Sequence, residues 1–182
     1  RDHRHVTSLL HRIKTSENGV ICKPVLSFDE RGHQKNNMIY YVAGSTENGE
    51  NPVSFFPTVA SFIGESGTFL APEALAKNQK GCGAGKEFAG EEALGAMTFA
   101  EIMLAPGQAQ EYIVVSGMTE SEEEITRTAE AFHTKEQADA AFIKAKEYWN
   151  GLINISFETG NPKEDSYLKW ICFQPILRRI YG

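Results

Sequence analysis

The sequence is poor in the residues on which several classes of function depend. It has only three cysteines, Cys22, Cys82 and Cys172, which are odd in number and far apart. That pattern argues against a disulfide framework or a zinc site, and it favours reduced thiols in a cytoplasmic protein. No apolar run approaches the roughly 20 residues that a membrane-spanning helix needs, so we expect no membrane partner.

Basic charge is scarce as well. Eighteen lysines and arginines face 24 aspartates and glutamates, which gives a net charge of −6. The basic residues are scattered along the chain rather than gathered into a stripe. Surfaces that bind nucleic acid need clustered cations to follow the phosphate backbone. We therefore expect no nucleic-acid partner.

Acid/base chemistry has few candidates among the aspartates. There are four of them, and each sits in a sequence pattern typical of a turn, a helix surface or a cap: Asp2, Asp29, Asp139 and Asp165. A general acid for glycoside cleavage needs a closed pocket that raises its pKa, and no carboxylate here has such a setting in the sequence. Taken from the residues alone, the sequence predicts no catalytic residue.

Nucleophile and metal motifs are also missing. Ser66 follows Gly64 at the spacing of a Gly-x-Ser-x-Gly elbow, but Thr68 stands where the second glycine is required. Three histidines near the amino end have only Asp2 close by, so we interpret them as loop histidines and predict no metal site: His3, His5 and His11.

A glycine-rich stretch at residues 81–86 (GCGAGK) invites a nucleotide interpretation, which its spacing does not support. Lys80 occupies the position of the first P-loop glycine, and Glu87 follows Lys86 where serine or threonine is needed. The dinucleotide fingerprint fails too, because Lys86 replaces its third glycine and no βαβ pattern surrounds it. We interpret the stretch as a flexible loop and predict no nucleotide cofactor.

Residues 20–117 have the pattern of β structure. Short β-branched or aromatic runs, separated by turn-forming residues, occur at 20–22, 25–28 and 38–42. Two later runs, 96–104 and 109–117, flank the turn sequence Ala-Pro-Gly-Gln, which predicts a hairpin. Short strands at regular spacing predict an antiparallel β-sandwich.

The pattern becomes helical from Thr119 onward. Ser121 with Glu124, and Thr134 with Gln137, have the spacing of capping boxes. The second of these helices is expected to end at Gly151. We therefore predict an α+β chain, with a β-sandwich domain over residues 1–118 and C-terminal linker helices over residues 119–182.

The last helix is expected to begin after Asn161, with Pro162 in the first position and Glu164 completing a capping box. It is apolar on more than one side, which is typical of a helix buried among neighbours. We therefore expect the chain to be an excerpt of a larger protein. The alternative is a terminal helix that docks in a groove of its own domain.

Two further expectations concern this helix. Pro175 removes a backbone donor, which predicts a bend or break near residues 171–172. If the partners of the helix are absent, exposed Trp170, Phe173 and Leu177 should drive self-association.

Three stretches, in this order, resemble glycoside hydrolase family 94, formerly glycosyltransferase family 36. The first is residues 54–67 (SFFPTVASFIGESG) with 72–75 (PEAL), and the second is 92–107 (EALGAMTFAEIMLAPG) with 111–117 (EYIVVSG). The third comprises Tyr148-Trp149, residues 157–162 (FETGNP), Trp170, Phe173-Gln174 and residues 179–182 (RIYG). Their spacing matches the family over the whole chain, with the end of the N-terminal β-sandwich domain followed by a helical linker and the first barrel helix.

The resemblance implies a parent enzyme with a β-sandwich domain, a helical linker and an (α/α)6 barrel. Such an enzyme cleaves a β-glucoside by inverting attack of inorganic phosphate, which is a co-substrate, so no cofactor is implied. The general acid of the family is an aspartate of the barrel, beyond Gly182. This chain would then be non-catalytic by itself; it would shape the entrance for a β-glucan oligosaccharide and, as in the family, take part in a homodimer contact. The second of the three stretches looks closest to phosphorylases that act on longer β-glucans.

Glu65 and Ser66 are the candidate substrate-binding residues, because they follow the Phe-Ile-Gly turn of the resemblance. Some branches of the family have an arginine at the position that Glu65 occupies here.

Two other functions stay open. One is an autonomous carbohydrate-binding module that stacks sugars on aromatic rings, the candidates being Tyr40, Tyr41, Phe55, Phe56 and Phe62, which could instead be strand-core residues. The other is a structural domain that dimerises through its helices.

Overall fold

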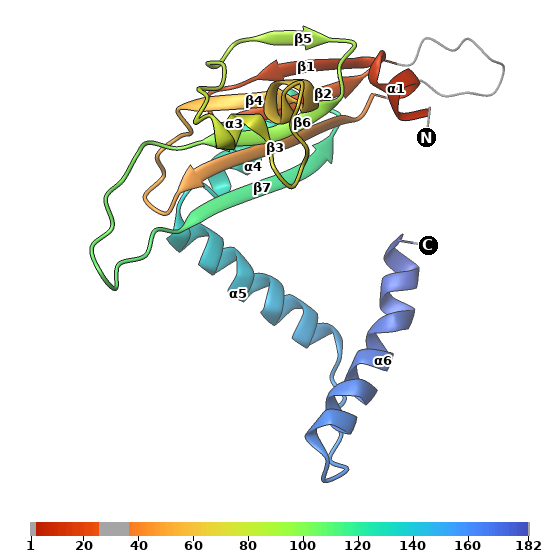
Figure 1. Cartoon of the computed structure of the whole chain (residues 1–182). Helices are drawn as coiled ribbons and strands as arrows, with labels where there is room; N and C mark the ends of the chain where they lie inside the picture. The colour runs from red at the N-terminus through yellow and green to blue at the C-terminus, as the bar shows by residue number, and fades with distance from the viewer. Residues whose placement is uncertain (1–2, 26–36, 182) are drawn as a thin grey trace, which may run out of the picture. The chain divides into compact units, whose positions relative to one another are not determined.

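Two antiparallel sheets stacked face to face form most of the first part of the chain (Figure 1). The structure is a computed structural model that describes residues 3–25 and 37–181, and the chain divides into two units, Arg1–Ala138 and Asp139–Gly182. The larger sheet, sheet A, has the order β5-β1-β2-β3-β7, and the smaller, sheet B, pairs β4 with β6. The strands are β1 (His11–Thr15), β2 (Gly19–Pro24), β3 (Ile39–Thr46), β4 (Ser54–Thr58), β5 (Glu87–Ala89), β6 (Ala93–Thr98) and β7 (Tyr112–Thr119).

The predicted α+β class with an antiparallel β-sandwich is confirmed, since every strand pair is antiparallel and helices follow the strands. The predicted strand at 20–22 lies within β2, and the one at 38–42 coincides with β3 from Ile39 onward. Strands β1, β4 and β5 were not expected. The predicted strand at 25–28 lies, apart from Val25, outside the described residues.

The core between the sheets is built by the alternation of side chains along β1 and β2. Ile13 of β1 and Val20 of β2 point toward sheet B, where Phe55 of β4 meets them. These three side chains are 2–4% exposed, and burial of each contributes about 1.5–3 kcal/mol. Arg12 and Lys14, which flank Ile13 in sequence, consequently point to the outer face of sheet A.

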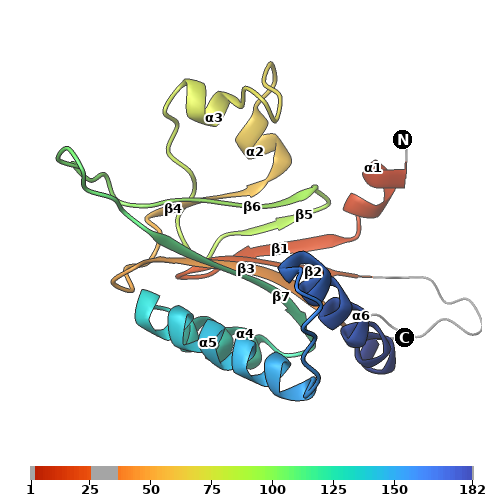
Figure 2. The same cartoon turned by 90° about the horizontal axis from the view of Figure 1, so that it is seen from below.

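Helices cover both outer faces of the sandwich, as Figure 2 shows. Helix α4 (Glu122–Ala131) packs on sheet A, where Ile125 closes a second core with Ile21 and Ile39. Helices α2 (Val59–Ile63) and α3 (Glu73–Ala76) lie on the far side of sheet B, and Phe56 meets Phe62 edge to face at 5.8 Å between ring centroids. The short α1 (His3–Ser8) precedes β1.

The glycine-rich stretch 81–86, which we call the glycine strap, connects the two sheets. The buried Thr15 hydroxyl of sheet A donates to the Gly83 carbonyl at 2.9 Å and accepts from the Lys86 N–H at 2.9 Å. Cys82 exchanges two backbone hydrogen bonds of 2.9 and 2.8 Å with Phe55 of sheet B. The stretch is a loop, as expected, but its backbone is hydrogen-bonded to both sheets rather than free.

The predicted hairpin across 96–117 is wrong. Strand β6 ends at Thr98 and pairs with β4 in sheet B, whereas β7 begins at Tyr112 and pairs with β3 in sheet A. The Pro-Gly turn does form, closed by a 3.0 Å hydrogen bond from the Gln108 N–H to the Ala105 carbonyl. The turn lies within a crossover between the sheets, because β6 belongs to sheet B and β7 belongs to sheet A.

The helix caps agree only in part with the expected capping boxes. Thr134 and Gln137 form theirs, with bonds of 2.9 and 3.3 Å, at the start of α5 (Lys135–Leu152). Helix α4 begins after Ser121 as predicted, but the Ser121 side chain caps nothing, and Glu124 instead accepts a hydrogen bond from Thr119. Gly151 lies inside the last turn of α5 rather than after it.

The second unit comprises the rest of α5 and helix α6 (Pro162–Tyr181). The Asn161 side chain accepts from the Lys163 N–H at 3.1 Å, which confirms the N-cap, but its own N–H bonds to Thr159 rather than to Glu164. Trp149 of α5 contacts Phe173 of α6 at 6.0 Å between ring centroids. A bend or break was predicted near residues 171–172, and the helix does not break there, since α6 continues through Pro175.

In the described ranges, none of the helices has the length and apolar character needed to cross a membrane.

The glycine strap generates a prediction with a matched control inside the same loop. A Cβ on Gly81 would lie 2.4 Å from the Phe55 carbonyl oxygen, whereas one on Gly83 would meet nothing within 4 Å. Gly81→Ala should therefore destabilise the chain by about 1–3 kcal/mol through overpacking. Gly83→Ala should change stability by less than about 0.5 kcal/mol. Urea unfolding followed by far-UV circular dichroism measures the free energy of unfolding of both variants. Equal losses of stability would show that the close approach of Gly81 to Phe55 is unimportant.

Candidate functional site

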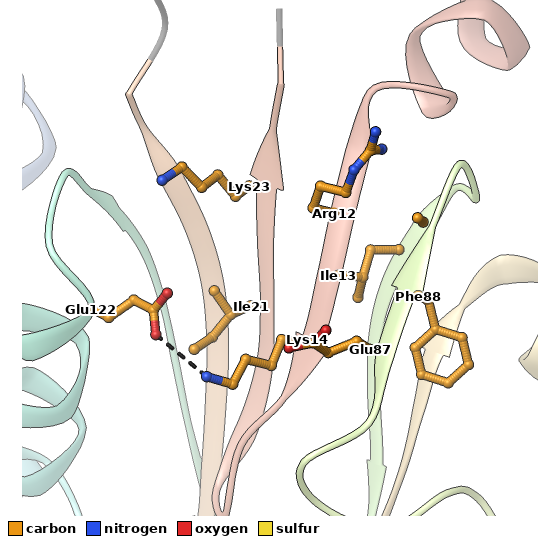
Figure 3. A pocket seen from close by; sticks show the side chains of 9 residues that line it. Arg12, Ile13, Lys14, Ile21, Lys23, Glu87, Phe88 and Glu122 are labelled. Atoms are coloured by element: carbon orange, nitrogen blue, oxygen red, sulfur yellow. Dashed lines mark ion pairs between the residues drawn. The ribbon is translucent and has the colours of Figure 1, made fainter.

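A shallow trough of about 400 Å³ lies on the outer face of sheet A, between β5 and α4 (Figure 3). We call it the basic trough. It is formed by five charged side chains around an apolar floor that includes Ile21: Arg12, Lys14, Lys23, Glu87 and Glu122.

Strand register gathers these charges. Arg12 pairs across the strands with Lys23, and Lys14 pairs with Ile21 on one side and with Glu87 on the other. Because side chains alternate, all of these residues leave the same face of sheet A. Helix α4 covers that face over Ile21 and Ile39, and the strands nearer β5 stay open.

The charges of the basic trough partly neutralise one another. Lys14 Nζ lies 3.6 Å from a carboxylate oxygen of Glu122, with side chains 48% and 56% exposed, so the pair contributes less than about 1 kcal/mol. Arg12 donates to the carbonyls of Leu9 and His11 at 3.2 and 2.9 Å. Both carboxylates face lysines on an open surface, whereas a glycoside-cleaving acid needs a closed pocket. The trough can hold a charged group but offers no acid/base pair.

The sequence-predicted candidates Glu65 and Ser66 lie elsewhere, in the turn between α2 and α3 on the far side of sheet B. Both are exposed. The structure therefore does not bring them together with the basic trough, and the two surfaces are on opposite sides of the sandwich (Figure 2).

Glu73, which was not among the candidates predicted from the sequence, holds this turn in place. One of its carboxylate oxygens accepts from the Ser66 N–H at 3.2 Å, and the other accepts from Lys77 Nζ at 2.7 Å. The hydrogen bond from Lys77 lowers the pKa of Glu73. Its carboxylate also fills the space beside Gly64, where a Cβ would lie 2.5 Å from it. Glu73 thus positions the Glu65–Ser66 segment.

The aromatic candidates for sugar stacking are mostly core residues. Phe55 and Phe56 are 2% and 4% exposed, and Phe62 packs on Phe56. Tyr41 packs against the core beneath α4, and only Tyr40, at 45%, is well exposed. The observations therefore favour strand-core packing over a stacking platform for four of the five.

The remaining candidates are also in structural roles or outside the described residues. Asp2 and Asp29 are not described, Asp139 lies exposed on α5, and Asp165 accepts two 2.8 Å hydrogen bonds from Thr159. The histidine interpretation needs correction, because His3 and His5 lie in α1 and His11 opens β1 rather than a loop. Over the described ranges, no three histidine, cysteine or acidic side chains gather into a metal site.

We expect the Ser66 amide to report the ionisation of Glu73. Because the folded-state pKa of Glu73 is lowered, the hydrogen bond is fully formed above the ordinary glutamate range and is lost as pH falls through that lowered value. The chemical shift of the Ser66 amide, followed by nuclear magnetic resonance from pH 6 downward, should change in one step. The midpoint of that step should lie below the ordinary pKa of glutamate. Glu73→Gln should remove the step and Glu65→Gln should leave it. A midpoint at or above the ordinary value would contradict this assignment.

Comparison with known families agrees with this architecture. The family model described as "Glycosyl hydrolase 94, supersandwich domain" matches residues 2–135, a range that contains all the strands of both sheets and α4. None of the curated proteins compared with the chain matches it. The family match covers most of the chain, and it confirms the family resemblance over the range that contains the first two of the three sequence stretches. The chain therefore belongs to glycosyl hydrolase family 94, and residues 2–135 are its supersandwich domain.

Proposed function

We propose that this chain works within an inverting β-glucoside phosphorylase, as the carboxyl-side portion of the sandwich domain with the linker that follows it. The match of the family model to residues 2–135 carries this proposal. The chemistry of the described surface supports it, because the carboxylates of the basic trough and of the 64–67 turn are exposed or paired with lysines. Such carboxylates suit binding and positioning rather than acid catalysis.

The reaction proposed for the whole enzyme is phosphorolysis of a β-linked glucose oligosaccharide. A phosphate oxygen forms a bond to the anomeric carbon from the face opposite the leaving group while the glycosidic C–O bond breaks. A general acid, which the family resemblance places in the barrel, protonates the departing oxygen. Inversion gives an α-configured sugar 1-phosphate, and inorganic phosphate is a co-substrate, so no cofactor takes part.

In this proposal the sandwich domain shapes the entrance for the oligosaccharide and contributes to a homodimer contact. A cytoplasmic location accompanies it, supported by the three free thiols Cys22, Cys82 and Cys172. The observations on the aromatic candidates give no support to an autonomous module that binds sugars by ring stacking.

The test compares the 182-residue chain with the full-length protein of the same reading frame. We expect the full-length protein to release α-sugar 1-phosphate from cellodextrins or β-1,2-glucan oligosaccharides only when phosphate is present, as followed by ³¹P nuclear magnetic resonance. We expect no turnover by the chain alone. Hydrolysis without phosphate, or turnover by the chain that is lost in Asp139→Asn or Asp165→Asn, would contradict the proposal.

Helix α6 supplies a second expectation, which concerns association. Of the three side chains expected to be exposed, Trp170 is 54% exposed, whereas Phe173 and Leu177 are half-buried. Tyr167 and Ile171, which are 62% and 44% exposed, lie at helical spacing from Trp170, so these three share one face. Exposed apolar patches of this kind drive association, and we expect the chain to self-associate with rising concentration. Replacing all three with serine should give a monomer in sedimentation velocity, whereas Lys163→Ser with Arg178→Ser should not. A wild-type chain that stays monomeric would refute the expectation.

A further inference from the structure

A second cavity, of about 430 Å³, lies at the end of sheet B where the glycine strap begins. It falls within the size range typical of small-molecule sites, about 300–1,000 Å³. Six of the side chains around it carry the argument: Asn78, Gln79, Lys80, Thr98, Phe99 and Glu101. All belong to the first unit, and none takes part in the basic trough or the 64–67 turn.

The segment 78–80 is held rigidly at both ends. At its start, α3 ends in a Schellman motif, with Asn78 in the left-handed region at φ 46° and hydrogen bonds from Asn78 to Leu75 and from Gln79 to Ala74. At its end, the Gly81 N–H donates to the Ser54 hydroxyl at 3.2 Å. The three side chains between these anchors therefore project from a fixed backbone, which lowers the entropy cost of binding.

The polar groups of the cavity are available to a ligand. Asn78, Gln79, Lys80 and Glu101 are exposed, and their side chains make no hydrogen bond or ion pair within the described part of the chain. Two side-chain amides offer both donors and acceptors, the ammonium adds donors, and the carboxylate adds acceptors. The floor, by contrast, is already satisfied, because the hydroxyls of Ser54 and Thr98 bond to each other.

An aromatic wall completes the cavity. Phe99 is half-buried and packs on Tyr112 at 4.5 Å between ring centroids, which fixes the orientation of its ring. One cation and one anion give the lining no net charge, which disfavours phosphate and other anions. An apolar ligand would leave two amides and two charges without partners. The lining instead suits a neutral ligand with many hydroxyls and an apolar C–H face.

We propose that this cavity binds one unit of a carbohydrate chain, with Asn78, Gln79 and Glu101 on its hydroxyls and Phe99 against its C–H face. The identification of that carbohydrate as a β-linked glucose oligosaccharide rests on the function proposed above. The cavity is then a binding subsite of the sandwich domain, separate from the centre where the glycosidic bond is cleaved.

The test titrates the 182-residue chain with cellotetraose and follows its backbone amides by nuclear magnetic resonance. We expect chemical-shift changes confined to residues 78–81 and 98–101. These changes should saturate as cellotetraose is added, which gives a dissociation constant. Asn78→Gly keeps the left-handed backbone while removing the amide, and Gln79→Ala and Glu101→Gln remove single groups. Each should weaken binding about two- to tenfold, the loss of one hydrogen bond. Gln174→Ala on α6 and Glu123→Gln on α4 are matched controls that should bind like wild type.

Absence of shifts at these residues, or unchanged affinity in all three variants, would overturn the subsite. The outcome is independent of the phosphorolysis assay. Phosphorolysis by the full-length protein without binding here refutes the subsite alone. Binding here by a protein that shows no phosphorolysis refutes the proposed reaction and leaves the subsite standing. Glucose 1-phosphate serves as a competitor, and preferential binding of it would show an anion site and also contradict the proposal.

Discussion

The glycine strap is the constraint on which the rest of the sandwich depends. Sheet B has two strands, too few to be stable alone, and it needs a fixed place on sheet A. The strap supplies that place through polar bonds, since Thr15 binds its backbone from one sheet and Phe55 pairs with Cys82 from the other. Thr15 is fully buried, so its hydroxyl and the groups that it binds are shielded from water, where an unpaired group would be costly. With the position of sheet B fixed in this way, Phe55 packs against Ile13 and Val20 in a single arrangement.

Local signals in the sequence predicted which segments are strands or helices better than they predicted their partners. The period-two run Arg12-Ile13-Lys14-Thr15 could have revealed β1, and Thr58 with Ser61 could have revealed the box that caps α2. The Pro-Gly turn at 106–107 was recognised, but a turn does not determine that its flanking strands pair. That pairing failed because β6 finds its partner forty residues upstream in β4, through non-local packing that no short window contains.

The candidate sites were harder to predict for the same reason. Strand register brings Arg12 beside Lys23, and helix α4, which packs on sheet A, adds Glu122 to the same trough. The sequence pointed to Glu65 and Ser66 through a family resemblance. The Glu73 that holds them was missed, because its role depends on Gly64 approaching its carboxylate and on Gly67 approaching its backbone nitrogen. Residues 78–80 looked like an ordinary polar loop. Only the Schellman motif before them and the close approach at Gly81 after them turn that loop into one wall of a cavity.

The crossover from β6 to β7 also bears on how the molecule is assembled during synthesis. In sheet A, Ile39 pairs with Thr119 and Arg12 with Ala89, so both outer strands join after long intervening stretches have been made. Such non-local pairing is slow to form, because the chain must close a large loop before any contact is gained. Until residue 119 leaves the ribosome, the β3 edge presents unpaired backbone groups, which other chains can also recruit. The order of translation therefore makes β7 the strand that covers the β3 edge and completes this side of sheet A.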